Sequence, residues 1–412
     1  MLQRSAGVVL LLCGVLAGCG SGDFTPPGAP ATASPGSPTP SPSPEATSAG
    51  YLHVLQRPWV MTYEIDPSGR LRPPVTQRIS KDLHTLAGEP QGRFVYAEHG
   101  GWTRLGGVDG SDGAIVSYAP DPRDGTLVEV SERTVFEHGG QPCTYCSWGG
   151  WQWLKGGANR VHGFWLHLYG SWGQHAKYTY VSIPVASDGY LGPVSRQPFE
   201  YEDEGSALVD VRANVLYKAG SYNERGGLEA HLIEPDGTLT RMGWTNLCLA
   251  SPMGFSGPLV TARGFLFSSF WNRVSTVCAY QGLRLKPLYA LDLAASVADA
   301  FVPSSEDQPV LVAMGLRTWT GREYRSALRI FSMNHEGDLR QMYAEDLPDY
   351  IEKLLFHPSG RSLYTVDRIA GLRVYTIDPE GRIELAMNIE HGGGSMAITL
   401  KDARPEAQNA GQ

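Results

Sequence analysis

The feature of this 412-residue chain that most constrains its fold is a pattern of four short runs of β-branched and aromatic residues between Ile351 and Ile389. The runs are separated by His357-Pro358-Ser359-Gly360 and by Asp378-Pro379-Glu380-Gly381. In each turn the proline fixes φ at the first central position, and the glycine accepts the positive φ that closes the hairpin. The pattern therefore predicts four antiparallel strands in about 40 residues, which is the size of one blade of a β-propeller.

The second of these turns recurs along the chain. A run of apolar residues that leads into Asp-Pro-x-Gly-x-Leu, or into a degenerate form of this motif, occurs seven times. A unit this small cannot bury its apolar faces alone, so the copies must stack against one another. We therefore predict an all-β fold, a seven-bladed β-propeller with four antiparallel strands per blade. The copies other than the one at Asp378 are Tyr63–Leu71, Asp121–Leu127, Val185–Leu191, Glu234–Leu239, Met333–Leu339 and Tyr289–Leu293, which lacks the glycine.

The two ends of the globular region predict how the ring closes. Three strands at its beginning, Tyr51–Gln56, Trp59–Ile65 and Val75–Ile79, have no partner before them, and Ser395–Leu400 is left over after the seventh blade. We expect this last strand to join the first blade, which removes two sheet edges that would otherwise invite aggregation. The best helix candidate, Ala290–Ala300, is short.

The beginning of the chain differs in composition from the rest. Residues 1–18 have the apolar centre of a signal peptide, and Leu16-Ala17-Gly18-Cys19 resembles the lipobox of bacterial lipoproteins. The resemblance implies cleavage before Cys19 and a lipid on its thiol; a secretory signal with a chance cysteine is the alternative. Residues 19–50 are rich in Pro, Ser and Thr and predict an unfolded tether.

These segments give the expected organisation of the protein. The propeller is expected at residues 51–402, and a disordered tail at residues 403–412. The lipid would hold the protein outside the cytoplasm, anchored to the bacterial cell envelope at the outer membrane or the cell surface.

Charge and motifs exclude several classes of function. The formal net charge of −8 is spread along the chain without a basic stripe, so we expect no nucleic acid partner. No pattern typical of a phosphate-binding loop, a calcium loop or a zinc protease is present in the sequence. We therefore expect no cofactor and no metal. The expected protein is a monomer whose partners are the membrane and either an anionic carbohydrate or lactone or an envelope protein.

The predicted register separates two faces of the ring. The turns between third and fourth strands are tight, whereas the connections between second and third strands, and the crossover into blade three, are rich in aromatic residues and arginine. Aromatic rings stack on sugars and arginine binds carboxylates, so we expect a ligand site on the second face. The same side chains would also pack the loops against one another. The candidate ligand-binding residues are Trp102, Trp148, Trp151, Trp153, Trp172, Tyr222, Arg225, Trp271, Arg273, Arg317, Trp319, Arg322 and Arg368.

Glu98 and His99 are the best acid–base candidates in the chain. They follow a predicted second strand and therefore lie where the richer loops begin. Arg104 follows in the same loop.

The four cysteines beyond the leader, Cys143, Cys146, Cys248 and Cys278, form an even set, which outside the cytoplasm favours disulfides. Cys248 in a crossover and Cys278 in a loop between second and third strands are expected on the same face and could pair. Cys143 and Cys146 could close a small loop. A zinc site and a redox-active Cys143/Cys146 pair are the alternatives.

Three segments carry a resemblance to a known family. His357–Tyr364, Val374–Gly381 and Gly92–Glu98 resemble the repeat of the lactonase family of seven-bladed propellers, which includes bacterial 6-phosphogluconolactonases. The resemblance covers blades one, two, four, six and seven. It implies a hydrolase of sugar lactones or related esters in which Glu98 or His99 activates water and an arginine such as Arg104 stabilises the oxyanion. The other hypothesis, which we favour from the sequence, is an anchored propeller that binds a ligand or a protein partner without turnover.

Overall fold

The structure, a computed structural model, is built from strands and turns. All the residues that it describes belong to one unit, Ala46–Gln412. Within them no helix is long and apolar enough to cross a membrane. The expected leader, the lipobox, the tether and the tail from residue 403 onward lie outside the described residues. The structure describes residues 49–100, 113–136, 146–157, 159–169, 175–200, 207–222, 225–246, 255–271, 276–305, 308–320, 322–367, 371–390 and 394–401.

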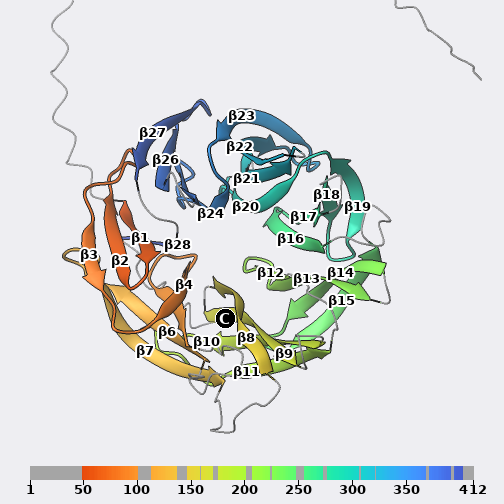
Figure 1. Cartoon of the computed structure of the whole chain (residues 1–412), viewed down its shortest axis with the longest axis horizontal. Helices are drawn as coiled ribbons and strands as arrows, with labels where there is room; N and C mark the ends of the chain where they lie inside the picture. The colour runs from red at the N-terminus through yellow and green to blue at the C-terminus, as the bar shows by residue number, and fades with distance from the viewer. Residues whose placement is uncertain are drawn as a thin grey trace, which may run out of the picture. The chain divides into compact units, whose positions relative to one another are not determined.

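The 28 described strands form seven sheets of four antiparallel strands, and the sheets are arranged around one axis as the blades of a propeller (Figure 1). This confirms the predicted architecture. From the axis outward, blades one to four are β28 (Ser395–Thr399), β1 (Gly50–Gln56), β2 (Trp59–Ile65), β3 (Val75–Arg78); β4 (Leu83–Gly88), β5 (Val95–His99), β6 (Gly113–Pro120), β7 (Leu127–Phe136); β8 (Cys146–Gly156), β9 (Arg160–Tyr169), β10 (His175–Pro184), β11 (Ser195–Glu200); and β12 (Ala207–Asp210), β13 (Val215–Tyr222), β14 (Arg225–Ile233), β15 (Leu239–Asn246). Blades five to seven are β16 (Phe255–Ala262), β17 (Phe265–Trp271), β18 (Thr276–Gln281), β19 (Lys286–Leu291); β20 (Ala295–Phe301), β21 (Val310–Trp319), β22 (Tyr324–Met333), β23 (Leu339–Leu347); and β24 (Ile351–Phe356), β25 (Ser362–Asp367), β26 (Gly371–Ile377), β27 (Ile383–Ile389).

The ring closes as the sequence predicts. The C-terminal strand β28 is the inner strand of blade one and pairs antiparallel with β1. His53 on β1 is fully buried and joins three strands of the blade: Nδ1 lies 3.1 Å from Oγ1 of Thr62 on β2, and Nε2 lies 2.9 Å from Oγ1 of Thr399 on β28. Burial lowers the pKa of His53 to about 3, so the ring is neutral at ordinary pH.

The apolar core is divided among the joints between blades. The described residues form seven buried clusters, and each cluster combines side chains from two neighbouring blades. At the closing joint, Leu52 and Met396 of blade one pack with Tyr364 and Val374 of blade seven. A chain of this length therefore needs no single large core, because each joint supplies its own.

The repeated turn forms because its aspartate satisfies the backbone of the hairpin. In blade one, Oδ1 of Asp66 accepts hydrogen bonds from the N–H groups of Ser68 and Arg70, at 2.8 and 3.0 Å. The N–H of Gly69 donates to the carbonyl oxygen of Asp66 at 2.9 Å, and Gly69 has a φ of +85°. The composition of the turn thus determines its conformation.

Two predictions for blade five are wrong. The helix candidate Ala290–Ala300 is instead the end of β19, a connection and most of β20. Tyr289–Leu293 is not the turn between third and fourth strands, because that turn lies at residues 282–285 and Tyr289 is on the fourth strand. Cys278 consequently lies on the third strand β18, not in a loop.

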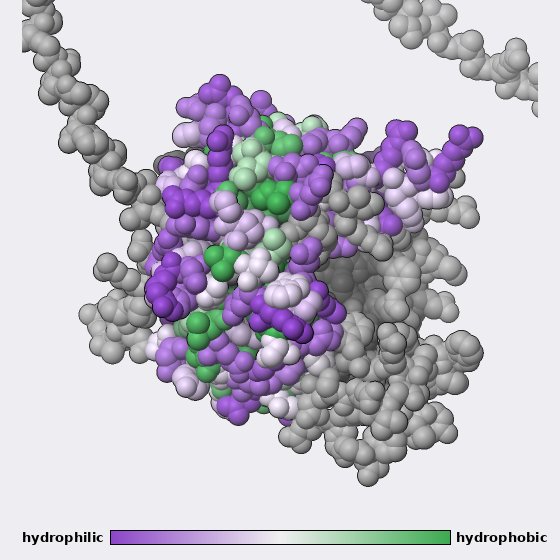
Figure 2. Space-filling view, turned by 60° about the vertical axis from the view of Figure 1, so that its left-hand side comes forward, coloured by the Kyte–Doolittle hydropathy of each residue, from purple (hydrophilic) through white to green (hydrophobic). Residues whose placement is uncertain are grey.

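The described residues that Figure 2 shows from one side are mainly hydrophilic. Hydrophobic side chains among them form small patches that are separated by polar ones. Exposed apolar residues of this kind are normal for a protein surface.

Candidate functional site

The two faces of the ring follow from strand direction. Successive strands of a blade are antiparallel, so the connections between second and third strands share one face with the crossovers between blades. We call this the loop face, and the opposite face, which carries the tight turns, the turn face. Each inner strand runs from the loop face to the turn face, while each second strand runs back.

The structure locates the predicted ligand-binding residues to different degrees. Trp148, Trp151 and Trp153 lie on the inner strand β8, not in the crossover before it, and their side chains are not described. Only the backbone is described for Tyr222 and Arg225, which pair at the ends of β13 and β14, and for Trp271 at the end of β17. Trp102, Arg104, Trp172, Arg273 and Arg368 lie outside the described residues.

Blade six brings two of the predicted residues together with two that were not predicted. The guanidinium carbon of Arg317 lies 4.1 Å from the ring centroid of Tyr324 and 4.5 Å from that of Tyr350. The ring of Trp319 lies 4.8 Å from that of Tyr324, and these two side chains are 56% and 47% exposed. We call Arg317, Trp319, Tyr324 and Tyr350 the blade-six cluster. Arg322 is exposed in the following loop.

The blade-six cluster is a platform on the loop face. An arginine between two aromatic rings is held by cation–π attraction and cannot swing freely. Nε of Arg317 is buried and makes no hydrogen bond within the described part of the chain. The exposed rings of Trp319 and Tyr324 leave flat surfaces on which a sugar could stack.

Glu98 is the most perturbed acidic group at the loop face. It lies near the end of β5 and is 4% exposed, and its Oε2 makes no hydrogen bond within the described residues. Burial raises the pKa of Glu98 to about 8, although the positive charges of Arg57 and Lys353 act in the opposite direction. At neutral pH this carboxyl is therefore mostly protonated, and it can release its proton under mildly alkaline conditions.

His99 does not join Glu98 in one site. Neighbouring residues on a strand point to opposite sides of the sheet. Nε2 of His99 lies 2.5 Å from Oε1 of Glu132, whose other oxygen accepts a hydrogen bond from Nζ of Lys81 at 2.7 Å. His99 therefore contacts Glu132, which also binds Lys81, instead of facing Glu98.

Lys353, one of the two cations whose charges lower the pKa of Glu98, lies on one of the strands that surround the axis of the ring. Lys353 lies on the inner strand β24, and its ammonium and the carboxyl of Glu98 each influence the other's pKa. Burial lowers the pKa of Lys353, and the charge of Lys155 lowers it further, whereas Asp299 and Glu98 raise it. Lys155, Asp299 and Lys353 lie on the inner strands of blades three, six and seven, and these strands surround the axis (Figure 1).

The structure describes only part of the two predicted disulfide pairings. Cys278 is fully buried on β18 and is not a free thiol. Cys143 and Cys248 lie outside the described residues, and only the backbone of Cys146, at the start of β8, is described. Both predicted pairings therefore stay predictions.

The seven four-stranded sheets define a seven-bladed β-propeller, and comparisons with known proteins agree with this class. No family model and no curated protein matches the sequence. A proposed 6-phosphogluconolactonase from Bacteroides fragilis is similar in structure, with a TM-score of 0.59 and 14% identity over 87% of this chain and 100% of that one. The periplasmic gluconolactonase PpgL of Pseudomonas aeruginosa has a TM-score of 0.54 and 17% identity over 85% and 99% of the two chains.

A further similar structure is a protein from Lactobacillus plantarum, with a TM-score of 0.55 and 11% identity over 86% and 99% of the two chains. At these identities the likeness shows the fold. The chain therefore shares the seven-bladed architecture of lactonase-like propellers, as its repeat indicates.

Proposed function

We propose that the loop-face end of the axis hydrolyses a lactone, the cyclic ester of a sugar acid, and that Glu98 transfers the proton. The observation that carries the proposal is the state of Glu98, which is a buried carboxyl with one unpartnered oxygen and a pKa of about 8. A group whose pKa is close to the working pH is suited to exchange a proton during a reaction. Two structurally similar propellers, described as a proposed 6-phosphogluconolactonase and a gluconolactonase, add support.

The chemistry follows from the charges near this carboxyl. Ionised Glu98 accepts a proton from the water that attacks the ring carbonyl, and Lys353 and Arg57 are the cations available to stabilise the oxyanion. The bond from the carbonyl carbon to the ring oxygen then breaks. Protonated Glu98 returns the proton to the departing alkoxide, which leaves the open-chain hydroxy acid. Because the ionised form starts the reaction, the rate rises with pH and levels off above about pH 8.

The test measures the loss of glucono-δ-lactone at several pH values, with the spontaneous rate subtracted. Glu98→Gln is expected to bring hydrolysis down to the spontaneous rate. Glu132→Gln, which changes an exposed and paired carboxylate on the same blade, is expected to keep it. Full activity in Glu98→Gln would refute the proposal.

A second candidate function, ligand binding without turnover, is favoured by the blade-six cluster. Its exposed rings and clamped guanidinium are suited to a sugar that carries a carboxylate. Sugar acids and cell-wall glycan fragments would be titrated into the protein while the fluorescence of its tryptophans is followed. A saturable response that disappears in Trp319→Ala, with the ligand recovered unchanged, is expected for a receptor; an unchanged response in the variant contradicts it.

We infer from the lipobox-like segment that Cys19 anchors the protein to the cell envelope, outside the cytoplasm. The prediction is that Cys19→Ser moves the protein from the membrane fraction to the soluble fraction. An unchanged distribution would favour the ordinary secretory signal.

A further inference from the structure

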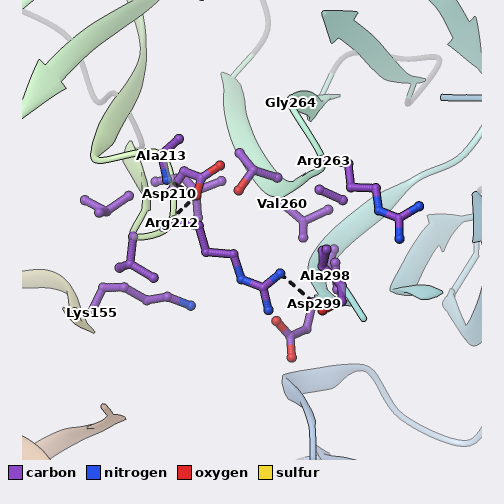
Figure 3. A pocket seen from close by; sticks show the side chains of 16 residues that line it. Lys155, Asp210, Arg212, Ala213, Val260, Arg263, Gly264, Ala298 and Asp299 are labelled. Carbon is purple, nitrogen blue, oxygen red and sulfur yellow. Dashed lines mark hydrogen bonds between the residues drawn. The ribbon is translucent and has the colours of Figure 1, made fainter. Parts of the chain in front are cut away.

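A pocket of about 330 Å³ lies at the turn face, the end of the ring opposite to the predicted site. Its walls are the turn-face ends of four inner strands, β8, β12, β16 and β20, together with the turns that follow β12 and β16. The tight turns were expected to leave little room for a ligand. The pocket forms because the turn-face ends of these inner strands, from blades three to six, surround one space (Figure 3).

Three charged side chains from three blades point toward one another in this pocket (Figure 3). Nη1 of Arg212, in the turn after β12, donates a hydrogen bond to the carbonyl oxygen of Val302 at 3.1 Å. Lys155, at the end of β8, is exposed and makes no hydrogen bond or ion pair with the residues that the structure describes. On β20, Oδ2 of Asp299 accepts a hydrogen bond from the N–H of Phe356 at 2.8 Å.

The charges of this pocket do not cancel. Asp210, the other acidic residue of its lining, is engaged in its own turn, where Oδ1 accepts hydrogen bonds from the N–H groups of Arg212 and Ala213 at 3.0 and 3.1 Å. The lining holds three cations, Lys155, Arg212 and Arg263, against two carboxyl groups, of which only Asp299 is left to face the cations. Val260, Ala298, Ala300 and Val302 add an apolar wall beside these groups.

We propose that this pocket is a second binding site, for a small carboxylate that also carries hydroxyl groups. The guanidinium of Arg212 keeps N–H groups for the carboxylate after its bond to Val302, and Lys155 adds a second positive charge. Asp299 accepts hydrogen bonds from hydroxyl groups, and the apolar wall covers the carbon chain. A free sugar acid has all of these groups. The site lies at the other end of the axis from Glu98 and does not depend on the proposed hydrolysis.

The first experiment is a calorimetric titration of the full-length protein with sodium gluconate. Saturable binding is expected, and glucose, which lacks the charge, and hexanoate, which lacks the hydroxyl groups, should each bind at least about tenfold more weakly. Sulfate should not displace gluconate at similar concentration. Absence of saturable binding, or equal binding of sulfate, would overturn the proposal, because the pocket would then be at most a general anion patch.

Variants assign the binding to this pocket. Lys155→Gln removes an exposed charge without breaking a hydrogen bond or an ion pair to the described residues, so it should fold normally and weaken gluconate binding about tenfold. Arg263→Gln is the matched control, because Arg263 points away from the pocket centre and donates to the carbonyl oxygens of Ser305 and Gln308 (Figure 3).

A further variant tests the role of the carboxylate in the pocket. Asp299→Asn should reduce the preference for gluconate over hexanoate. Unchanged affinity in Lys155→Gln, or an equal loss of binding in Arg263→Gln, would contradict a site at the turn face.

Discussion

The turns of blade six and blade five contain the same residue type in different surroundings. Gly337 in blade six has a φ of +91°, and a Cβ there would meet three ring atoms of Phe265, in blade five, at 2.3 to 2.8 Å. Gly282 in blade five has a φ of +67°, and a Cβ there would meet no atom within 4 Å. Gly125 in blade two resembles Gly337, because its missing Cβ makes room for the ring of Tyr51 in blade one.

The difference shows that a glycine in these turns can have two separable functions. In the six regular turns its positive φ closes the hairpin. Gly337 and Gly125 also let their turns lie against an aromatic ring near the start of the second strand of the preceding blade, Phe265 and Tyr51. In the turn of blade five, Gly282 has a positive φ but no such neighbour, and the N–H that bonds back to its carbonyl oxygen is that of Leu285. Residues of one type can therefore be compared in pairs that differ in their surroundings.

The largest effect is expected at the joint that closes the ring. A chain that ends at Gly394 lacks β28, so blade one loses its inner strand and the cluster shared with blade seven loses Met396 and Ile398. We expect no cooperative unfolding transition in a denaturant titration of this chain. A chain that ends at Lys401 is the control and should unfold as the full-length protein does. Equal transition midpoints for the two chains would show that β28 is dispensable.

The glycine pair gives the next largest effect. Gly337→Ala strains a positive φ and also pushes a methyl group into Phe265, so it should lower the free energy of unfolding by about 3 kcal/mol. Gly282→Ala strains φ alone and should cost about 1 kcal/mol. Both values come from urea unfolding at one temperature. If the two variants lose equal stability, packing between blades is not what distinguishes these turns.

Glu98 and Glu132 of blade two are a second pair of residues of one type in different surroundings, and they differ in the direction of their pKa shifts. Glu98 is buried with a folded-state pKa of about 8, whereas Glu132 is partly exposed and its ion pairs lower its pKa. Between about pH 4.5 and pH 8 the folded state holds a proton on Glu98 that the unfolded state has released, so stability falls as pH rises. The contribution is about 1.4 kcal/mol per pH unit. Thermal unfolding across this range should show a shallower fall in Glu98→Gln.

The matched variant Glu132→Gln should not reduce the fall in stability between pH 5 and pH 8. Its folded pKa is lowered, so its contribution is present above the pKa of the unfolded chain and is lost only as pH drops further. An unchanged slope in Glu98→Gln would mean that Glu98 is ionised in the folded protein.

Two exposed tyrosines give the smallest effect. Tyr324 is 47% exposed but contacts Arg317 and Trp319, whereas Tyr190 is 59% exposed and makes no ring contact with the described residues. Tyr324→Ala should lower the free energy of unfolding by about 1 kcal/mol, from the lost cation–π and ring contacts. Tyr190→Ala should change it by less than about 0.5 kcal/mol. Chemical denaturation of both variants tests this, and equal losses would mean that the blade-six cluster is not held together by these contacts.

The fold could be predicted because its information is local and repeated. The aspartate and glycine of each turn determine a hairpin within a few residues, and the count of strands at the two ends predicts the closure. The predicted turn of blade five was wrong because the turn of this blade does not follow the Asp-Pro-x-Gly pattern. Its turn ends at Leu285, a non-glycine residue with a φ of +54°, while Tyr289–Leu293 imitates the sequence of the regular turn.

The site could be predicted only in part because its contacts are not local. Glu98 was found as the acidic residue at the end of a second strand, but nothing in the sequence links it to Lys353, which comes from another blade. Lys155 and Arg212 belong to no motif. They meet in the turn-face pocket because inner strands of different blades end around the same space, which depends on the geometry of the closed ring.

The position of β28 also determines when this protein can become a propeller. His53 and Thr399, which are bonded in blade one, are 346 residues apart in the chain. Blade one therefore has to wait, with one sheet edge unpaired, until almost the whole polypeptide has been synthesised. A chain released before β28 has been made keeps the edge of β1 unpaired, and such an edge is open to pairing with another chain.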